Sequence, residues 1–186
     1  MTSRTGNHDA LAEELLEFLR DSFDGISVEV ARSPRWKRMC ATFRWAGFND
    51  LLPEERFHRL SRAIPESFRE EKLAGFVWVE LAEGESLEDF LKLPRSEDVD
   101  ARANTVAGEL SKVGFFGALK RSLGANPEKK CAGDFAHSLK VLKAAKLPPA
   151  SAQDARLLFI RHHAYCDCQV LQTVEAALAK RHAAAS

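Results

Sequence analysis

Long apolar runs are absent from this sequence of 186 residues. No stretch approaches the roughly 20 consecutive apolar residues that a helix needs to cross a bilayer, so we expect no membrane-spanning segment. The first 20 residues contain four acidic side chains, Asp9, Glu13, Glu14 and Glu17. Acidic residues among the leucines are not the pattern of a secretory signal. We therefore expect a cytoplasmic protein.

Short motifs of common catalytic chemistry are also missing. The sequence contains no Gly-rich phosphate loop, no nucleophile elbow of the Gly-x-Ser-x-Gly type and no His-Glu-x-x-His helix. Asp167, which lies between two cysteines, would act as a general base only if the fold placed it in a pocket. We assign no catalytic residue, and the sequence favours a protein that binds a partner over one that transforms a substrate.

Net charge is absent as well, because 27 Lys and Arg residues balance 27 Asp and Glu residues. The balance conceals two opposite halves: 14 basic minus 20 acidic residues give −6 for residues 1–98, and 13 minus 7 give +6 for residues 99–186. Halves of opposite charge are consistent with docking of one half on the other or with ordinary solvated surfaces. A basic half can also bind an acidic partner. We expect a protein partner, with nucleic acid as the alternative and no membrane.

The first half predicts an α+β fold, in which a three-stranded sheet carries helices on one face. Apolar residues recur at helical spacing or alternate at strand spacing, and their order is helix, strand, strand, helix, strand, helix. The expected elements cover about residues 8–22, 26–30, 39–45, 53–64, 76–81 and 86–91.

This element order, with Phe48 followed eight residues later by Arg56 and with His58 nearby, resembles the BolA-like family. The domains of that family are similar to the type II KH fold that binds nucleic acid. The resemblance covers about residues 8–91 and implies this fold for the first half. A KH domain clamps the nucleic-acid backbone with a Gly-x-x-Gly loop. The only such spacing here, residues 114–117, is apolar and lies within a helical pattern, so it predicts core packing.

Three arginines, Arg56, Arg59 and Arg62, are helical neighbours in the first half. Such a group can contact phosphates. Several glutamates surround it in the sequence, however, and they favour a solvated surface with ion pairs. We expect the arginines to belong to that surface.

The second half predicts a small helical bundle. Pro94 blocks helix continuation and a charged turn follows it, so we expect a first domain over residues 1–93, a linker over 94–101 and a helical domain over 102–186. Apolar spacing predicts one long helix from Val99 to Leu119 and three further helices. The latter cover about residues 132–146, 152–161 and 167–181.

Cysteine is scarce, but three of the four cysteines form a pattern that indicates a site. Cys166 and Cys168 are separated by one residue where the last helix is expected to begin, and Cys131 follows two lysines. In a reducing compartment such thiols are metal ligands or redox groups more often than disulfides. Zinc takes four ligands, typically thiolates and imidazoles. The three cysteines therefore supply three positions of a zinc site.

His137 is the first choice for the fourth ligand, and His162 or His163 is the alternative. Six residues along a helix rotate about 600°, so Cys131 must lie before the helix that carries His137. Four protein ligands would make the metal structural, whereas an open fourth position would permit hydrolytic chemistry. Two other interpretations stay open: a redox pair of Cys131 with one of the other two thiols, and cysteines that are merely small buried hydrophobes. Cys40 is expected to pack in the core.

The second half also resembles an uncharacterised bacterial family, domain of unknown function 2695. Its members carry a cysteine that opens a helix, a histidine-threonine pair along that helix and, about thirty residues later, a Gly-Gly-Tyr-Cys-Asp-Cys-Glu-Val segment. The matching residues are Cys131, His137, Ser138, Tyr165, Cys166, Asp167, Cys168 and Val170. The resemblance covers about residues 128–176. Because the family has no established activity, the resemblance implies a site and no particular chemistry.

Overall fold

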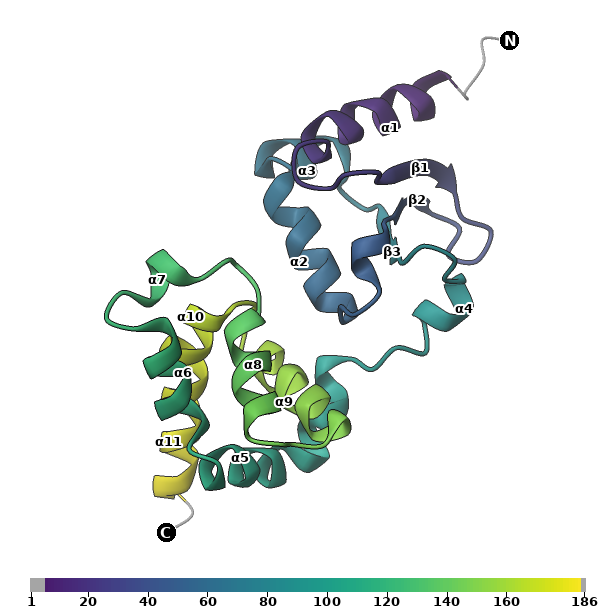
Figure 1. Cartoon of the computed structure of the whole chain (residues 1–186). Coiled ribbons are helices and arrows are strands. Elements are labelled where there is room, and N and C mark those ends of the chain that lie inside the picture. The colour runs from purple at the N-terminus through teal and green to yellow at the C-terminus, as the bar shows by residue number, and fades with distance from the viewer. Residues whose placement is uncertain (1–5, 185–186) are drawn as a thin grey trace. The chain divides into compact units, whose positions relative to one another are not determined.

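The chain folds into two compact units, residues 1–94 and 95–186, and each is described by itself (Figure 1). The computed structural model describes the backbone of residues 6–184 and the side chains of residues 8–179. The elements of the first unit are α1 (Gly6–Leu19), β1 (Ser27–Arg32), β2 (Met39–Arg44), η1 (Ala46–Phe48), α2 (Pro53–Ala63), α3 (Glu66–Lys72), β3 (Val77–Leu81) and α4 (Leu87–Phe90).

A three-stranded sheet organises the first unit, and the predicted α+β fold class is confirmed. The strand order is β1-β2-β3, with β1 antiparallel to β2 and β2 parallel to β3. The hairpin register runs from Ser27 opposite Arg44 to Arg32 opposite Met39. A parallel pair needs a crossover connection, and α2 and α3 provide it. The sequence predicted α2 but not α3.

Helices cover both faces of the sheet, which differs from the single helical layer that we expected. Alternate residues of β2 separate the two layers: Ala41 and Phe43 belong to a core with Leu15 of α1 and Leu60 of α2. Cys40 points into a second cluster with Val79, Leu81 and Phe90. Phe90 lies in α4, so this short helix closes the second face. Cys40 packs in the core, as expected.

Arg56 is buried, which corrects the expectation of a solvated arginine surface. Only 1% of its side chain is exposed. Its guanidinium donates to the carbonyl oxygens of Leu51 at 3.0 Å and Glu80 at 2.7 Å. It also donates to the Glu85 carboxylate and lies 5.7 Å from the centre of the Phe48 ring. A buried charge is tolerated when its donors are satisfied, and here these contacts join α2 to the end of β3.

Helices alone build the described part of the second unit, residues 95–184. They are η2 (Ser96–Arg102), α5 (Ala103–Lys112), α6 (Phe115–Leu123), α7 (Pro127–Lys130), α8 (Ala136–Ala144), α9 (Pro149–Arg161), α10 (Asp167–Gln169), η3 (Val170–Val174) and α11 (Glu175–Ala184). The last three follow one another without a break, and η3 is a π-helical segment. Among residues 6–184, no helix has both the length and the apolar character that a membrane crossing requires.

Two segments of the second unit differ from the expected boundaries. The predicted long helix is divided at Gly114, whose left-handed φ of 62° separates α5 from α6; glycine adopts this conformation without a steric cost. The segment expected as a linker is largely η2, which packs on α9. Arg161 of α9 donates from Nε to Oδ1 of Asp100 at 2.8 Å. This contact assigns η2 to the helical unit.

Candidate metal centre

Three cysteine thiols of the second unit come together from separate segments. The Sγ atoms of Cys131, Cys166 and Cys168 all lie within 4.8 Å of one another. The sulfur atoms of Cys166 and Cys168 are 3.3 Å apart, and all three residues are free thiols. We call this group the three-cysteine cluster. It has the composition of a site that can bind a metal ion.

The backbone explains how two cysteines separated by one residue face the same point. Cys166 precedes α10 in an extended conformation, with φ −156° and ψ 165°. Cys168 lies within the first turn of α10. Two residues inside one helix that are two positions apart point about 200° away from each other. The change from extended to helical backbone at Asp167 removes this separation and brings the two sulfur atoms together.

Cys131 joins the cluster from a second segment, the connection between α7 and α8. It ends α7 with an extended backbone, φ −74° and ψ 120°, and α7 contacts α10. Gly133 then adopts a left-handed φ of 81° and turns the chain toward α8. Cys131 therefore lies before the helix that carries His137, as the spacing of the two residues predicted.

Asp167 connects the two segments that carry the cysteines through hydrogen bonds. Its side chain is completely buried, with 0% exposure. The carboxylate accepts hydrogen bonds from the backbone N–H groups of His137 at 2.8 Å and Ser138 at 2.7 Å, at the start of α8. The N–H of Asp167 itself donates to the carbonyl oxygen of Asp134 at 2.9 Å. A carboxylate at a helix N-terminus satisfies unpaired donors and interacts favourably with the helix dipole.

The capping position of Asp167 was missed by the sequence reasoning, which considered the residue only as a conditional general base. Both carboxylate oxygens are occupied by backbone donors, so the side chain acts in positioning. The local sequence held one signal. The residue before α8, Phe135, has no side-chain acceptor. Asp134 accepts the N–H of Ala136 at 2.9 Å, and the next N–H groups of the first turn, those of His137 and Ser138, need acceptors as well.

The three thiols differ in their electrostatic surroundings. Partial burial acts to raise the pKa of Cys131, but hydrogen bonds from the backbone of Cys168 and Gly133 and from the Cys168 and Cys166 thiols together outweigh burial and lower this pKa. Burial raises the pKa of Cys166 to about 12, against a backbone hydrogen bond from Gln169. Burial also raises the pKa of Cys168. N–H groups directed at sulfur favour the thiolate, so the surroundings of Cys131 favour its charged form, whereas burial disfavours the charged form of Cys166 and Cys168.

The candidate histidines are not members of the three-cysteine cluster within residues 8–179. His137 Nδ1 is hydrogen-bonded to the hydroxyl of Ser122 in α6 at 2.7 Å. His162 ends α9, and His163 is exposed with a left-handed φ of 58°. The structure thus brings together three of the four residues predicted as ligands.

Comparison with known proteins does not identify a relative. No known family, curated protein or solved structure matches the chain. The two family resemblances stay predictions, and functional conclusions rest on the residues of the chain itself.

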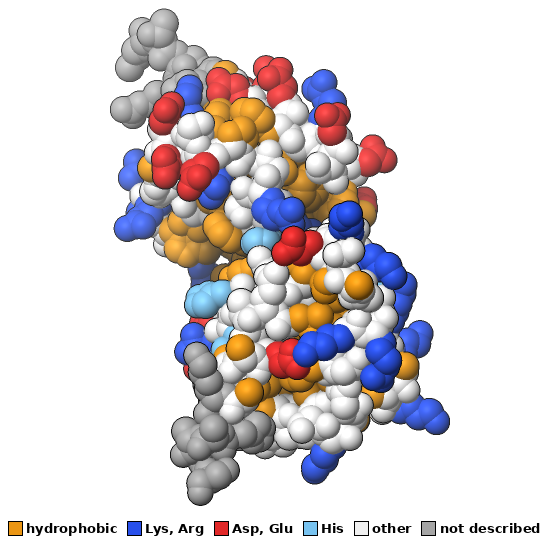
Figure 2. Space-filling view, turned by 90° about the vertical axis from the view of Figure 1, so that its left-hand side faces the viewer, with side chains coloured by type: hydrophobic (Ala, Val, Ile, Leu, Met, Phe, Trp, Pro, Cys, Tyr) orange, Lys and Arg blue, Asp and Glu red, His pale blue; other side chains and the backbone are white. Residues whose placement is uncertain are grey.

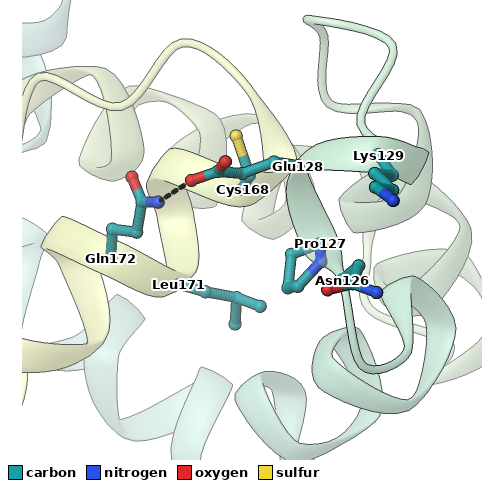
Figure 3. A pocket seen from close by; sticks show the side chains of 7 residues that line it. All are labelled: Asn126, Pro127, Glu128, Lys129, Cys168, Leu171 and Gln172. Atoms are coloured by element: carbon teal, nitrogen blue, oxygen red, sulfur yellow. Dashed lines mark hydrogen bonds between the residues drawn. The ribbon is translucent and has the colours of Figure 1, made fainter.

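A pocket of about 340 Å³ adjoins the cluster (Figure 3). Its lining residues are Asn126, Pro127, Glu128, Lys129, Cys168, Leu171 and Gln172. Figure 3 shows Glu128 extending from α7 toward Gln172 of η3, and the two side chains form a hydrogen bond of 3.1 Å. The helix that leads to Cys131 and the helical segment that carries Cys168 therefore both contribute walls to this pocket.

Proposed function

We propose that the second unit binds one zinc ion through the thiolates of Cys131, Cys166 and Cys168, and that the ion stabilises the folded unit. The convergence of the three sulfur atoms within 4.8 Å carries this proposal. A tetrahedral zinc ion with Zn–S bonds of about 2.3 Å places neighbouring sulfur atoms about 3.8 Å apart. The observed 3.3 Å between Cys166 and Cys168 is close to that spacing, so small side-chain adjustments admit the ion.

The chemistry of the donors supports zinc or a similar thiophilic ion. Thiolates are soft ligands and select zinc over magnesium or calcium. Three thiolates around a divalent cation leave one net negative charge. Lys129 and Lys130 are exposed next to Cys131, and their charges offset it.

In this account the protein is a binding module whose helical unit is held together by metal. On the face shown in Figure 2, basic side chains far outnumber acidic ones over the second unit. Exposed lysines contribute to its charge: Lys112, Lys129, Lys130, Lys140, Lys143 and Lys146. The surface fits a protein partner with an acidic face. Nucleic acid is the alternative, and it predicts binding that weakens steeply with salt.

Metal removal is expected to loosen the second unit selectively. With a strong chelator, peptides that cover α7, α8 and α10 should exchange their amide hydrogens about tenfold faster or more, because the ion stabilises only the folded state. Peptides from β1, β2 and β3 serve as the internal control and should exchange at an unchanged rate. Hydrogen exchange followed by mass spectrometry measures both. Equal rates with and without chelator in all peptides would contradict the proposal.

A thiol redox function is the second candidate. Two observations favour it: the Cys166 and Cys168 sulfur atoms lie 3.3 Å apart, and backbone hydrogen bonds lower the pKa of Cys131 despite its partial burial. The two functions differ in the effect of zinc on alkylation. A metal site predicts that stoichiometric zinc protects Cys131 from iodoacetamide, whereas a redox thiol in a protein that does not bind zinc stays equally reactive.

His163 has a left-handed backbone conformation, with φ 58°, and replacing it tests whether the residue matters for the backbone or as a metal ligand. His163 donates its N–H to Ile160 at 2.8 Å and Ala164 donates to Phe159 at 3.0 Å, the hydrogen-bond pattern in which glycine is preferred after a helix. His163→Gly is expected to raise the free energy of unfolding by about 0.5–1 kcal/mol and to leave zinc binding unchanged.

Lys146 offers a matched control for this substitution. It follows α8 in the same conformation, with φ 55°, and lies outside the cluster. Lys146→Gly should therefore stabilise the protein by a similar amount in chemical denaturation. If His163→Gly alone lost zinc, His163 would be the fourth ligand.

A further inference from the structure

We infer that the exposed side of α8 binds an amphipathic acidic segment of a partner protein, in which an apolar side chain is flanked by carboxylates. We call this surface the α8 face and define it by Leu139, Lys140 and Lys143. The inference rests on the partner binding proposed above, and it names the surface and the chemistry of the partner. It does not depend on the zinc ion, so the ion and the α8 face are tested separately.

The first observation is an apolar side chain on the outer side of α8. Leu139 is 40% exposed. Ser138 and Leu142 are the buried residues of this helix, so α8 already packs in the helical unit through another side. Removal of the Leu139 side chain from water by a partner is favourable.

The second observation is the positive charge beside this leucine. Lys143 lies four residues after Leu139 and three after Lys140, so both are its neighbours on the helix surface. Lys140 and Lys143 are exposed, and among residues 8–179 neither lysine forms an ion pair. Two like charges three residues apart on a helix repel each other. An acidic partner therefore relieves this repulsion.

The third observation is that the acidic residues around α8 have other roles. Residues 135–153 contain no Asp or Glu. At the two ends of this stretch, Asp134 accepts a backbone N–H of α8 at 2.9 Å, and Asp154 forms an ion pair at 2.8 Å with an arginine of η2. Asp167 is buried and accepts two backbone N–H groups of α8. A partner carboxylate can thus pair with the lysines of the α8 face without displacing any of these three.

The composition of the α8 face favours a protein over a nucleic acid. Among residues 95–179, the exposed large apolar side chains are Val113 and Leu139, and neither is an aromatic ring on which bases stack. Phosphates would use the two lysines and leave Leu139 in water. An amphipathic acidic segment uses all three side chains, because its apolar residue covers Leu139 while its carboxylates pair with the lysines.

The experiment measures the binding of a fluorescein-labelled synthetic helix to the full chain by fluorescence anisotropy. The probe is a peptide of about 18 residues, or roughly five helical turns, with leucines at helical spacing along one side and glutamates beside them. A second peptide has serine in place of each leucine. The leucine peptide should bind about tenfold more tightly than the serine peptide, because only leucine removes Leu139 from water.

Three variants test whether the α8 face is the binding surface. Leu139→Ser should weaken binding of the leucine peptide about tenfold and alter binding of the serine peptide by no more than about twofold. Lys143→Glu should weaken binding of both peptides about tenfold. Lys112→Glu makes the same charge change at an exposed position of α5 and should alter neither affinity by more than about twofold. This set of results would support the inference.

Four results would overturn it. Equal affinity for the two peptides, or no effect of Leu139→Ser, means that the face makes no apolar contact. Equal effects of Lys143→Glu and Lys112→Glu mean that overall charge attracts the peptide. Tighter binding of poly(U) RNA or of anionic lipid vesicles, lost in Lys143→Glu, would assign the face to phosphates. The zinc content of the same sample separates the two proposals: zinc without peptide binding overturns this inference alone, whereas peptide binding by a chain that takes up no zinc overturns the zinc site alone.

Discussion

Replacing Cys166 with serine is expected to abolish stoichiometric zinc binding and to remove most of the stability that zinc confers. A ligand at a concentration a thousandfold above its dissociation constant stabilises the folded state by about 4 kcal/mol, and a serine hydroxyl does not replace a thiolate in a zinc site. The free energy of unfolding in saturating zinc should therefore fall by about this amount. Chemical denaturation with and without chelator measures it.

Cys40→Ser is the control for the free-energy cost of burying a serine hydroxyl in place of a thiol. Cys40 and Cys166 are similarly buried, at 7% and 6% exposure, but only Cys166 belongs to the cluster. Cys40→Ser should lower stability by about 1 kcal/mol in zinc and in chelator alike. If Cys166→Ser lost the same stability in both conditions, the loss would be one of packing and the metal site would be contradicted.

Asp167→Asn is expected to destabilise the second unit by about 2–3 kcal/mol and to weaken zinc binding about tenfold or more. The carboxylate accepts two backbone N–H groups of α8 at 2.8 and 2.7 Å in a fully buried position. An asparagine amide keeps one acceptor and directs N–H groups at the second donor, so one buried N–H of α8 is left unpaired. Because this cap aligns α8 with α10, its loss also displaces the cysteines.

Asp154→Asn is the matched control for this aspartate. The Asp154 carboxylate pairs with Arg102 at 2.8 Å on the protein surface, where an ion pair contributes about 1 kcal/mol or less. This variant should retain full zinc affinity in a competition titration with a coloured chelator. Equal zinc affinity for Asp167→Asn and the wild type would show that the cap does not position the ligands.

Local patterns predicted most of the first unit. Alternating apolar residues predicted the β1-β2 hairpin, because each of these strands buries one face more than the other. The nearly continuous apolar run at residues 76–81 predicted β3. The helix at residues 86–91 was predicted and is α4, Leu87–Phe90. Its place on the second face of the sheet was missed, because a helix of this length shows no periodicity that indicates which face it covers. Arg56 was misjudged for a different reason. Its acceptors on Leu51 and Glu80 come together only when α2 packs against β3, and spacing along one helix does not show that contact.

The candidate site could be predicted in part. Cys-x-Cys at a helix start and a third cysteine before another helix predicted which thiols meet, since each segment places its thiol at an element boundary. Whether His137 is the fourth ligand depends on the direction of its side chain, which spacing along the sequence does not give. In the structure its Nδ1 is hydrogen-bonded to Ser122, and the cluster contains only the three cysteines among residues 8–179. The cap by Asp167 joins two segments far apart in the sequence, and periodicity within one helix contains no information about it.

The metal content of the protein, purified without a metal-affinity step and measured by native mass spectrometry together with a count of free thiols, tests the central claim most directly. The account predicts one zinc ion per chain, with Cys131, Cys166 and Cys168 protected from alkylation until a chelator is added. A metal-free chain with all four thiols free, which binds no zinc when zinc is supplied, would contradict it.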